Sequence, residues 1–486
     1  MRASRSSVEG MDRTTLLILG ASGDLTSRLL LPALAQLLQR EPDREIALLG
    51  AGMEDWDERR WQATLHDAFT AANAEAVLSR LDGSRYVRAD ITKSDDLRRL
   101  LDGVDGPLVV YFAVPPAITV QACAALRGVS LPDRTVLALE KPFGGDEAGA
   151  KRLNATLLAL VPEERIFRVD HFLGRATVLN VLGVRFANRV VEPLWSADHV
   201  ESVLIRFDEA LGLEDRARYY DHAGALIDML QSHLLQVLGI LAMEPPATLG
   251  ERDLRSAKTA ALRATRVWHD DPARASRRAR YTAGRIGERE LPDYVAEAGV
   301  DPARETETLA EMTCEVRTAR WAGVPFTLRS GKAIGTPRTE IVVTFRPVRH
   351  LPDGLHGGAP DGGVLRFSLG PDAMSLELNV NGGADPFELR RETLAVELGE
   401  GALRAYTEVI GDILDGDVTL SVRADAAEEC WRIVQPVRDA WARGEVPLEG
   451  YPAGSAGPAD WATSRLTPPA PPARPAAGAA SAPAAS

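Results

Sequence analysis

The first third of the chain alternates short apolar runs with longer stretches in which apolar residues recur every three or four positions. The short runs predict buried strands at residues 16–19, 45–49, 85–89, 107–113 and 135–139. The stretches between them predict helices at residues 29–38, 58–71, 94–101 and 117–125. Strands separated by helices are typical of parallel βαβ units. We therefore predict a doubly wound, Rossmann-like α/β domain at residues 14–185.

The pattern changes after about residue 190. Apolar and polar residues alternate at 202–207, 339–345, 365–369 and 374–380, which predicts antiparallel strands with one solvated face. Helical stretches remain at 224–241 and 398–412. Residues 186–466 are therefore predicted to form an α+β domain with a large, mainly antiparallel sheet. The Pro- and Ala-rich tail, residues 467–486, is expected to be disordered.

A glycine turn follows the first predicted strand. Residues 15–25 read TLLILGASGDL and pass through Gly20 and Gly23 into a helical pattern. Glycines let the chain turn tightly and let a pyrophosphate approach backbone N–H groups at a helix start. The spacing is G-x-x-G, which is shorter than the full dinucleotide-binding pattern, and a plain β–α turn fits the segment equally well.

Composition narrows the function classes. The net charge of −13 argues against a nucleic-acid partner, although a local cluster of cations can still bind an anionic small molecule. Cys123, Cys314 and Cys430 lie far apart and form neither a zinc motif nor a disulfide framework, so no metal is expected. Residues 1–13 lack the apolar core of a signal peptide, and no apolar run approaches the ~18 residues of a membrane span. A cytoplasmic location without membrane contact is expected.

Three further segments carry side chains suited to catalysis. Lys141 follows a predicted strand and can hydrogen-bond a substrate or cofactor, or be an ordinary surface lysine. Asp170, His171 and Arg175 offer an acceptor, a donor and a fork for phosphate, or belong to a solvated loop. His233 lies in an apolar helix, where a histidine is usually a core residue unless a carboxylate makes it a general base.

The order of these segments resembles the glucose-6-phosphate dehydrogenase family from near residue 14 to about residue 466. The matching segments are GASGDL at 20–25, YFAVPP at 111–116, EKPFG at 140–144, RVDHFLGR at 168–175, YYDHAGALIDMLQSHLLQVLGILAMEPP at 219–246, RWAGVPFTLRSGK at 320–332 and GDVTL at 416–420. The resemblance implies an oxidoreductase that oxidises the C1 hydroxyl of D-glucose 6-phosphate to 6-phosphoglucono-1,5-lactone. Hydride would pass to NAD⁺ or NADP⁺, in the first step of the oxidative pentose phosphate pathway.

The resemblance also assigns residues. His233 matches the general base and Asp170 the carboxylate that orients it. The positions matching cofactor-binding residues are Gly20, Ser22, Gly23, Asp24, Leu25, Pro115 and Lys141. The positions matching substrate-binding residues are Lys141, His171, Arg175, Glu209, Asp228 and Lys332. Family members associate through the second-domain sheet, which implies a homodimer or a homotetramer.

Several positions depart from the family pattern. Leu29 and Ser27 stand where basic residues are usual, Ser232 replaces the Asn before the base, and Arg175 replaces a Lys. These changes leave fewer cations around the substrate phosphate. The same chemistry on a different aldose or aldose phosphate with NAD⁺, or a catalytically weakened regulatory homologue, therefore remains an alternative.

A further departure concerns the cofactor. Met53 stands where an Arg commonly binds the 2′-phosphate of NADP, and two carboxylates follow it. An acidic group there favours a free 2′-hydroxyl, so we predict a shift towards NAD⁺ or dual use. The alternative is that Arg59 or Arg60 supplies the missing charge.

Overall fold

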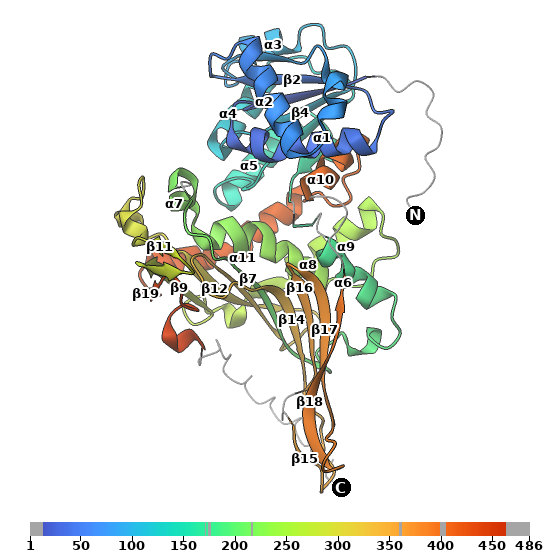
Figure 1. Cartoon of the computed structure of the whole chain (residues 1–486), viewed down its shortest axis with the longest axis vertical. Coiled ribbons are helices and arrows are strands. Elements are labelled where there is room, and N and C mark those ends of the chain that lie inside the picture. Colours follow the sequence, from blue (N-terminus) through green and yellow to red (C-terminus); the bar gives the residue numbers. More distant parts are fainter. Residues whose placement is uncertain are drawn as a thin grey trace, which may run out of the picture.

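The computed structural model describes residues 13–170, 172–173, 176–214, 217–358, 362–398 and 405–462. Figure 1 shows two units, a smaller one at the top that is built on the N-terminal strands and a larger one below it. The larger unit consists of a sheet with helices α8, α9 and α11 on the face that looks towards the smaller unit. The functional site must therefore be sought where these helices meet the end of the first sheet.

The N-terminal unit contains a parallel sheet of six strands in the order β3-β2-β1-β4-β5-β6. Its strands are β1 (Thr14–Leu19), β2 (Ile46–Gly52), β3 (Arg85–Arg88), β4 (Leu108–Phe112), β5 (Thr135–Leu139) and β6 (Ile166–Arg168). The chain moves outwards from the pair β1–β4 in both directions, so the topological switch point lies there. The predicted Rossmann-like fold is confirmed, and the three-residue strand β6 is an addition to the five strands predicted.

Helices connect these strands over both faces of the sheet. They are α1 (Leu31–Arg40), α2 (Glu58–Ala71), α3 (Ser94–Leu101), α4 (Pro116–Leu126) and α5 (Glu147–Leu158). The predictions for α2 and α3 match residue for residue. The Asp57 side chain caps α2 by accepting the Arg60 N–H at 2.8 Å. Ahead of α1 the chain first forms a π-helical turn, Thr26–Leu30, which the period of the sequence did not reveal.

The second unit is built on an eleven-stranded sheet in the order β15-β18-β17-β16-β14-β7-β13-β12-β9-β19, with β8 paired to β12. Its strands are β7 (Val200–Asp208), β8 (Thr265–Val267), β9 (Ser276–Thr282), β12 (Leu309–Val316), β13 (Pro325–Gly331), β14 (Thr339–Phe345), β15 (His356–Gly357), β16 (Val364–Leu369), β17 (Asp372–Asn381), β18 (Glu388–Glu397) and β19 (Leu448–Pro452). A separate pair joins β10 (Gly284–Ile286) to β11 (Arg289–Leu291). Most pairings are antiparallel, as predicted, but β7–β13, β9–β19 and β15–β18 are parallel.

One predicted helix in this unit was wrong at its start. The sequence pattern placed a helix at residues 398–412, whereas Leu398 directly follows the strand β18. The helix described there, α10, spans Ala405–Asp415 and is followed by Gly416, which has a φ of +72°; residues 399–404 lie outside the described residues. The other helices of this unit are α6 (Ala176–Phe186), α9 (Glu251–Ala264) and α11 (Ala424–Ala442).

The long helix predicted at residues 224–241 is divided into three parts. It runs as α7 (Ala217–Ala225), a π-helical segment (Leu226–Leu234) and α8 (Leu235–Ala242). Among the described residues, Tyr219–Ala242 is long and apolar enough to cross a membrane, but 94% of its most apolar window is buried inside the protein. That burial is typical of a core helix, and the apolar sequence reflects the core it fills.

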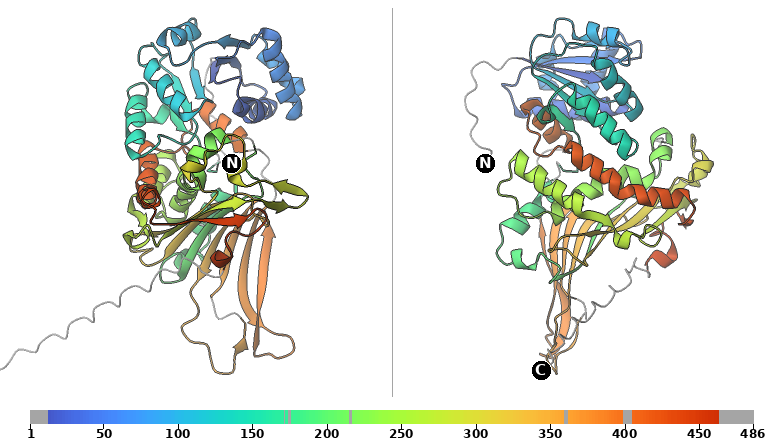
Figure 2. Two further views of the ribbon diagram at one scale, coloured as in Figure 1. Left: turned by 90° about the vertical axis from the view of Figure 1, so that its left-hand side faces the viewer. Right: turned by 180° about the vertical axis from the view of Figure 1, so that it is seen from behind.

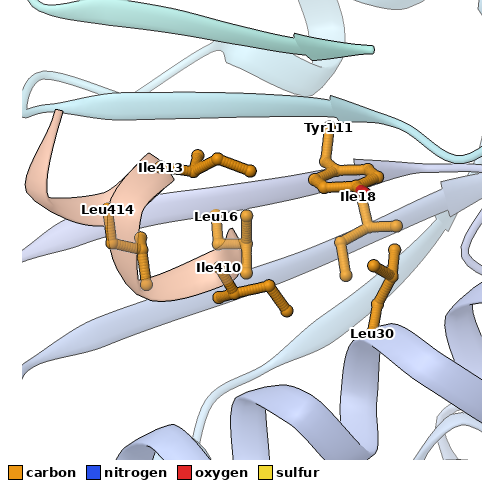
Figure 3. Close-up of a pocket in the computed structure, with 7 residues that line it drawn as sticks. All are labelled: Leu16, Ile18, Leu30, Tyr111, Ile410, Ile413 and Leu414. Atoms are coloured by element: carbon orange, nitrogen blue, oxygen red, sulfur yellow. The ribbon is translucent and has the colours of Figure 1, made fainter. Parts of the chain in front are cut away.

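Helix α10 joins the two units, although it comes from the C-terminal part of the chain. Its residues Ile410 and Ile413 belong to one apolar cluster with Leu16 and Ile18 of β1. Figure 3 shows the small apolar pocket where they meet. The lining residues are Leu16, Ile18, Leu30, Tyr111, Ile410, Ile413 and Leu414. Figure 2 shows from two further sides that strands β16 to β18 extend away from this junction.

The backbone break at Gly224 gives a stability prediction. Gly224 has a φ of +62°, and a Cβ there would lie 2.3 Å from the Glu307 carboxylate. We expect Gly224→Ala to lower the free energy of unfolding by roughly 1–3 kcal/mol, measured by chemical denaturation. The control is Gly183→Ala in α6, where nothing lies within 4 Å, and we expect that change to stabilise by roughly 0.5–1 kcal/mol. Equal effects of the two substitutions would contradict the strain at Gly224.

Candidate active site

The glycine turn lies at the switch point between β1 and β4. Gly20 has a φ of +90°, and a Cβ there would lie 2.3 Å from the Ala113 carbonyl oxygen after β4. The Gly20 N–H donates to Ala51 O at 2.7 Å, and the Gly23 N–H donates to Gly20 O at 3.0 Å. Only glycine fits this close approach, which lies at the switch point where doubly wound sheets bind nucleotides. The segment therefore fits the pyrophosphate of a dinucleotide.

The other positions expected to bind the cofactor surround this turn. Ser22, Asp24 and Leu25 continue the turn towards the π-helical segment that begins at Thr26. Pro115 lies on the β4 side, immediately before α4. These residues and the turn thus form one edge of the crevice, and Lys141 lies beyond β5 at the same carboxyl ends of the strands.

At the end of β2, a carboxylate follows Met53, the residue that stands where the family resemblance implies a cation. The Ser22 hydroxyl donates a hydrogen bond to Glu54 Oε2, and the Tyr86 hydroxyl donates to Glu54 O at 3.0 Å. The hydrogen bond from Ser22 lowers the pKa of Glu54, which keeps the carboxylate ionised. Met53 beside it is 59% exposed. A negative charge is therefore held at the tip of β2.

Arginines are present near this carboxylate. The Arg60 guanidinium lies 5.5 Å from the centre of the Trp56 ring, and Arg88 lies 3.7 Å from the Asp55 carboxylate. The alternative that Arg59 or Arg60 supplies the charge for a 2′-phosphate therefore stays a prediction.

A histidine and a carboxylate meet in the interior between the two units. His233 Nδ1 lies 2.7 Å from Asp170 Oδ1, and both side chains are 1% exposed. The Phe172 N–H also donates to Asp170 Oδ1, at 2.9 Å, and the Phe172 ring stacks on the imidazole with centres 4.3 Å apart. Because Asp170 accepts at Nδ1, Nε2 is the nitrogen that would take a proton. The imidazole is thus fixed in position and in tautomer.

Burial lowers the pKa of His233, and the charge of Asp170 opposes that shift. Lys141 lowers the pKa of His233 further. A base of this kind is neutral at neutral pH, and its carboxylate stabilises the imidazolium once a proton arrives. The arrangement is suited to accepting a proton at Nε2.

Two pairs of opposite charges lie beside the dyad. Lys141 Nζ donates to both the carboxylate and the carbonyl of Asp228, the latter at 3.1 Å, and the Tyr219 hydroxyl donates to the same carboxylate at 3.2 Å. Burial lowers the pKa of Lys141, but the combined effect of Asp228, Tyr219 and Glu140 leaves that pKa raised. Burial raises the pKa of Asp228, but Lys141, Lys332 and His233 together leave it lowered. Both groups are therefore charged.

The second pair comes from the large sheet. Lys332 Nζ lies 2.9 Å from Glu209 Oε2 and 5.1 Å from the centre of the Tyr220 ring. The charge of Lys332 also lowers the pKa of Asp228, as expected for two neighbouring pairs. The structure therefore brings together His233, Asp170, Lys141, Asp228, Glu209 and Lys332 from both units. The expected phosphate ligands His171 and Arg175 lie outside the described residues.

Sequence reasoning did not assign Glu140, although the EKPFG segment contains it. Burial raises its pKa, and its Oε1 atom accepts hydrogen bonds from the hydroxyls of Tyr111 at 2.6 Å and Tyr406 at 3.2 Å. Tyr406 belongs to α10, so Glu140 links that helix to the strand end that carries Lys141. In the sequence, only the position of Glu140 immediately before Lys141 indicated that it could belong to the site.

Comparison with known proteins gives a consistent result. Residues 17–180 match the family described as glucose-6-phosphate dehydrogenase, NAD binding domain, and residues 182–465 match its C-terminal domain. The glucose-6-phosphate 1-dehydrogenase of Gluconobacter oxydans (strain 621H) is 39% identical over 466 residues, which cover 91% of this chain and 94% of that protein. The enzyme of the same name from Treponema pallidum (strain Nichols) is 35% identical over 472 residues, covering 91% and 92%.

Solved structures show the same likeness. The crystal structure of glucose-6-phosphate 1-dehydrogenase from Mycobacterium avium superposes with a TM-score of 0.81 and 32% identity, covering 93% of this chain and 96% of that one. A glucose-6-phosphate dehydrogenase in complex with its substrate glucose-6-phosphate has the same TM-score, 0.81, at 26% identity and with the same coverage, 93% and 96%. The similarity therefore extends through both units.

The dyad can be tested without a substrate. In Asp170→Asn the imidazole loses the negative charge that favours its protonated form, so we expect the pKa of His233 to fall further below its ordinary value. The titration of the ring protons by NMR measures this, with His233→Asn used to assign the resonance. The other histidine resonances in the same sample are the internal control. An unchanged His233 titration would show that Asp170 does not act on the imidazole.

Proposed function

Because the chain belongs to the glucose-6-phosphate dehydrogenase family, we propose that it oxidises D-glucose 6-phosphate at C1 to 6-phosphoglucono-1,5-lactone. Hydride passes to a nicotinamide dinucleotide, as in the first step of the oxidative pentose phosphate pathway. The observation that carries the proposal is the 2.7 Å contact between His233 and Asp170, which are 63 residues apart in the sequence. A regulatory protein that only binds ligands has no physical need for a buried base held by its own carboxylate.

In this reaction His233 is the general base. Its Nε2 atom accepts the proton of the C1 hydroxyl, while Asp170 holds Nδ1–H and stabilises the imidazolium that forms. When bound at the glycine turn, the nicotinamide cofactor supplies the acceptor for the hydride that leaves C1. The burial of the dyad keeps water from competing for the proton.

The paired charges position the sugar. Asp228 and Glu209 offer carboxylate oxygens to sugar hydroxyls, and Lys141 and Lys332 offer ammonium donors. Each carboxylate is held by a lysine, so the groups are oriented before the sugar arrives. His171 and Arg175 take the 6-phosphate in this proposal, on the strength of the family resemblance. Leu29, 41% exposed where the family has a cation, leaves Arg175 as the main phosphate fork.

The proposal extends to the domains and to assembly. Residues 14–185 form the dinucleotide-binding domain, which also contributes Lys141, His171 and Arg175 to the sugar site, and residues 186–466 form the substrate-binding domain that carries the contact between subunits. Strands β17 and β18 expose apolar side chains on their outer part, which favours a homodimer or homotetramer that covers this sheet. The exposed residues are Leu378, Val380, Leu394 and Val396. A cytoplasmic protein without nucleic-acid or membrane partners completes the proposal.

The activity test uses the absorbance of reduced nicotinamide. We expect a much faster rise in this absorbance with glucose 6-phosphate than with glucose. We expect His233→Asn to lower kcat by roughly 10²–10⁴-fold, because a positioned general base contributes about that much. The control Asn188→Ala changes an exposed residue after α6, whose side chain donates to carbonyl groups of that helix, and it keeps the wild-type rate. A wild-type rate in His233→Asn would remove His233 from the mechanism. No signal with any sugar and cofactor would favour the regulatory alternative.

We further propose that Glu54 shifts the cofactor preference towards NAD⁺ or dual use. The ionised carboxylate held by Ser22 accepts a hydrogen bond from a ribose 2′-hydroxyl and repels a 2′-phosphate. We expect Glu54→Gln to raise the ratio of kcat/KM for NADP⁺ to that for NAD⁺ by about tenfold, because the repulsion of one charge is removed. Asp55→Asn is the matched control and has a smaller effect, because Asp55 is exposed and lies beside Arg88. A wild-type enzyme that favours NADP⁺ a hundredfold would refute the proposal.

A further inference from the structure

Close to Asp170 lies a group of buried polar side chains that the proposed chemistry does not use. It comprises Lys258 of α9, Gln236 of α8 and Cys430 of α11, which are 3%, 2% and 1% exposed. Gln236 Nε2 donates to Cys430 Sγ at 3.1 Å. The three helices that contribute these residues cover the large sheet on the side of the N-terminal unit (Figure 1). A lysine in such a place needs an explanation, because lysines are almost never buried without a partner.

Lys258 lies along the helix that carries the base. A Cβ on Gly239 would lie 2.8 Å from Lys258 Cγ, so the lysine stem passes α8 where the helix has no side chain. Gln236 and Gly239 are three residues apart in α8 and are therefore neighbours on its surface. The stem of Lys258 thus passes α8 beside Gln236, whose amide donates to Cys430 Sγ.

The polar atoms of this group are not fully satisfied. Asp170 uses Oδ1 for His233, whereas its buried Oδ2 atom receives no hydrogen bond from the described residues, and neither does Gln236 Oε1. None of the hydrogen bonds and ion pairs among the described residues involves Lys258. Burial lowers the pKa of Lys258 to about 8, and the attraction of the Asp170 carboxylate opposes that shift. A buried cation thus acts on a carboxylate whose second oxygen has no donor.

We propose that Lys258 is a positioning residue of the dyad, whose buried ammonium offsets part of the charge of Asp170 and so keeps His233 unprotonated until substrate binds. The inference rests on the function proposed above. A buried carboxylate without a counter-charge raises the pKa of its histidine and so favours the imidazolium, which cannot act as a base. A cation that draws on the same carboxylate weakens that hold, yet leaves Oδ1 in place to orient the ring. Lys258 therefore acts through Asp170 and touches neither sugar nor cofactor.

The other charged groups around the two residues come from several elements. Arg255 on α9 and Arg423 before α11 repel the Lys258 ammonium. Cys430 stays a neutral thiol, because burial raises its pKa to about 12. Around His233, Lys141 disfavours and Asp228 favours the protonated ring. Asp170 is the group that acts on both Lys258 and His233, so it is the route by which one affects the other.

The pH dependence of kcat/KM tests the inference. In Lys258→Met the charge is lost, His233 is protonated more readily, and the acid limb of the profile moves to higher pH. We expect kcat/KM near pH 6 to fall about tenfold more than near pH 9, the scale of one neighbouring charge. The difference in kcat/KM between the wild type and Lys258→Met disappears at alkaline pH, because Lys258 of the wild type loses its own proton there. Lys258→Arg keeps the charge and restores the wild-type limb.

A second measurement separates this inference from the proposed function. The NMR titration of His233 in the ligand-free protein needs no substrate, and we expect Lys258→Met to raise the pKa of His233. Cys430→Ala alters the same packing without a change of charge and leaves both readouts at wild type. If Lys258→Met does not fold, Lys258→Gln carries the same expectation. An unmoved profile and titration in the charge-free variant, or the same shift in Cys430→Ala, overturns the inference, whichever sugar the enzyme accepts.

Discussion

The contact between His233 and Asp170 is the interaction on which the rest of the structure depends, because its two partners belong to different units. Asp170 follows β6 at the edge of the parallel sheet, and His233 lies in a helix that covers the larger sheet. A hydrogen bond of 2.7 Å tolerates only a few tenths of an ångström of displacement. The two sheets must therefore be joined rigidly, and the fold can be understood as the means of holding that joint.

The joint is held by a buried ionic network next to Asp170. The Arg168 side chain, at the end of β6, is fully buried and lies 2.9 Å from Glu163 Oε1. The same Glu163 oxygen accepts from Arg255 of α9 at 3.0 Å and from the backbone N–H of Ala424, which starts α11, at 3.0 Å. A single carboxylate thus connects the strand that carries Asp170 to the two helices that pack beside the base. Burying such an ionic network costs desolvation free energy. We therefore interpret it as a means of orienting Asp170 rather than of stabilising the fold.

The apolar pattern predicted the fold well because most elements have one clearly buried face. The strand Thr135–Leu139 and the helix Glu58–Ala71 are found as the pattern placed them. The three-residue strand β6 escaped because it is too short to show a period and contains the buried Arg168. Residues 388–397, for which the sequence pattern gave no element, form the strand β18 by pairing with β17.

The site was less accessible to pattern reasoning. His233 and Asp170 are 63 residues apart, and no periodicity relates them; the family resemblance suggested the pair. Lys258 could not be found from the sequence, because a lysine in the amphipathic pattern of α9 normally points to solvent. The burial of charged groups is a tertiary property, and it is where the sequence is least informative.

The helix that carries the base adds one more step. Asp228 and His233 are five residues apart, a spacing that puts them on different sides of an α-helix but one above the other in a π-helix with its i→i+5 bonding. The π-helical segment Leu226–Leu234 therefore lets one helix present both the carboxylate that pairs with Lys141 and the base that pairs with Asp170. The break at Gly224, braced by the Leu226 N–H on the Glu307 carboxylate at 2.9 Å, sets where this segment begins. The π-helical geometry thus brings the Asp228 carboxylate, which positions the substrate, and the His233 imidazole, which accepts the proton, to the same side of one helix.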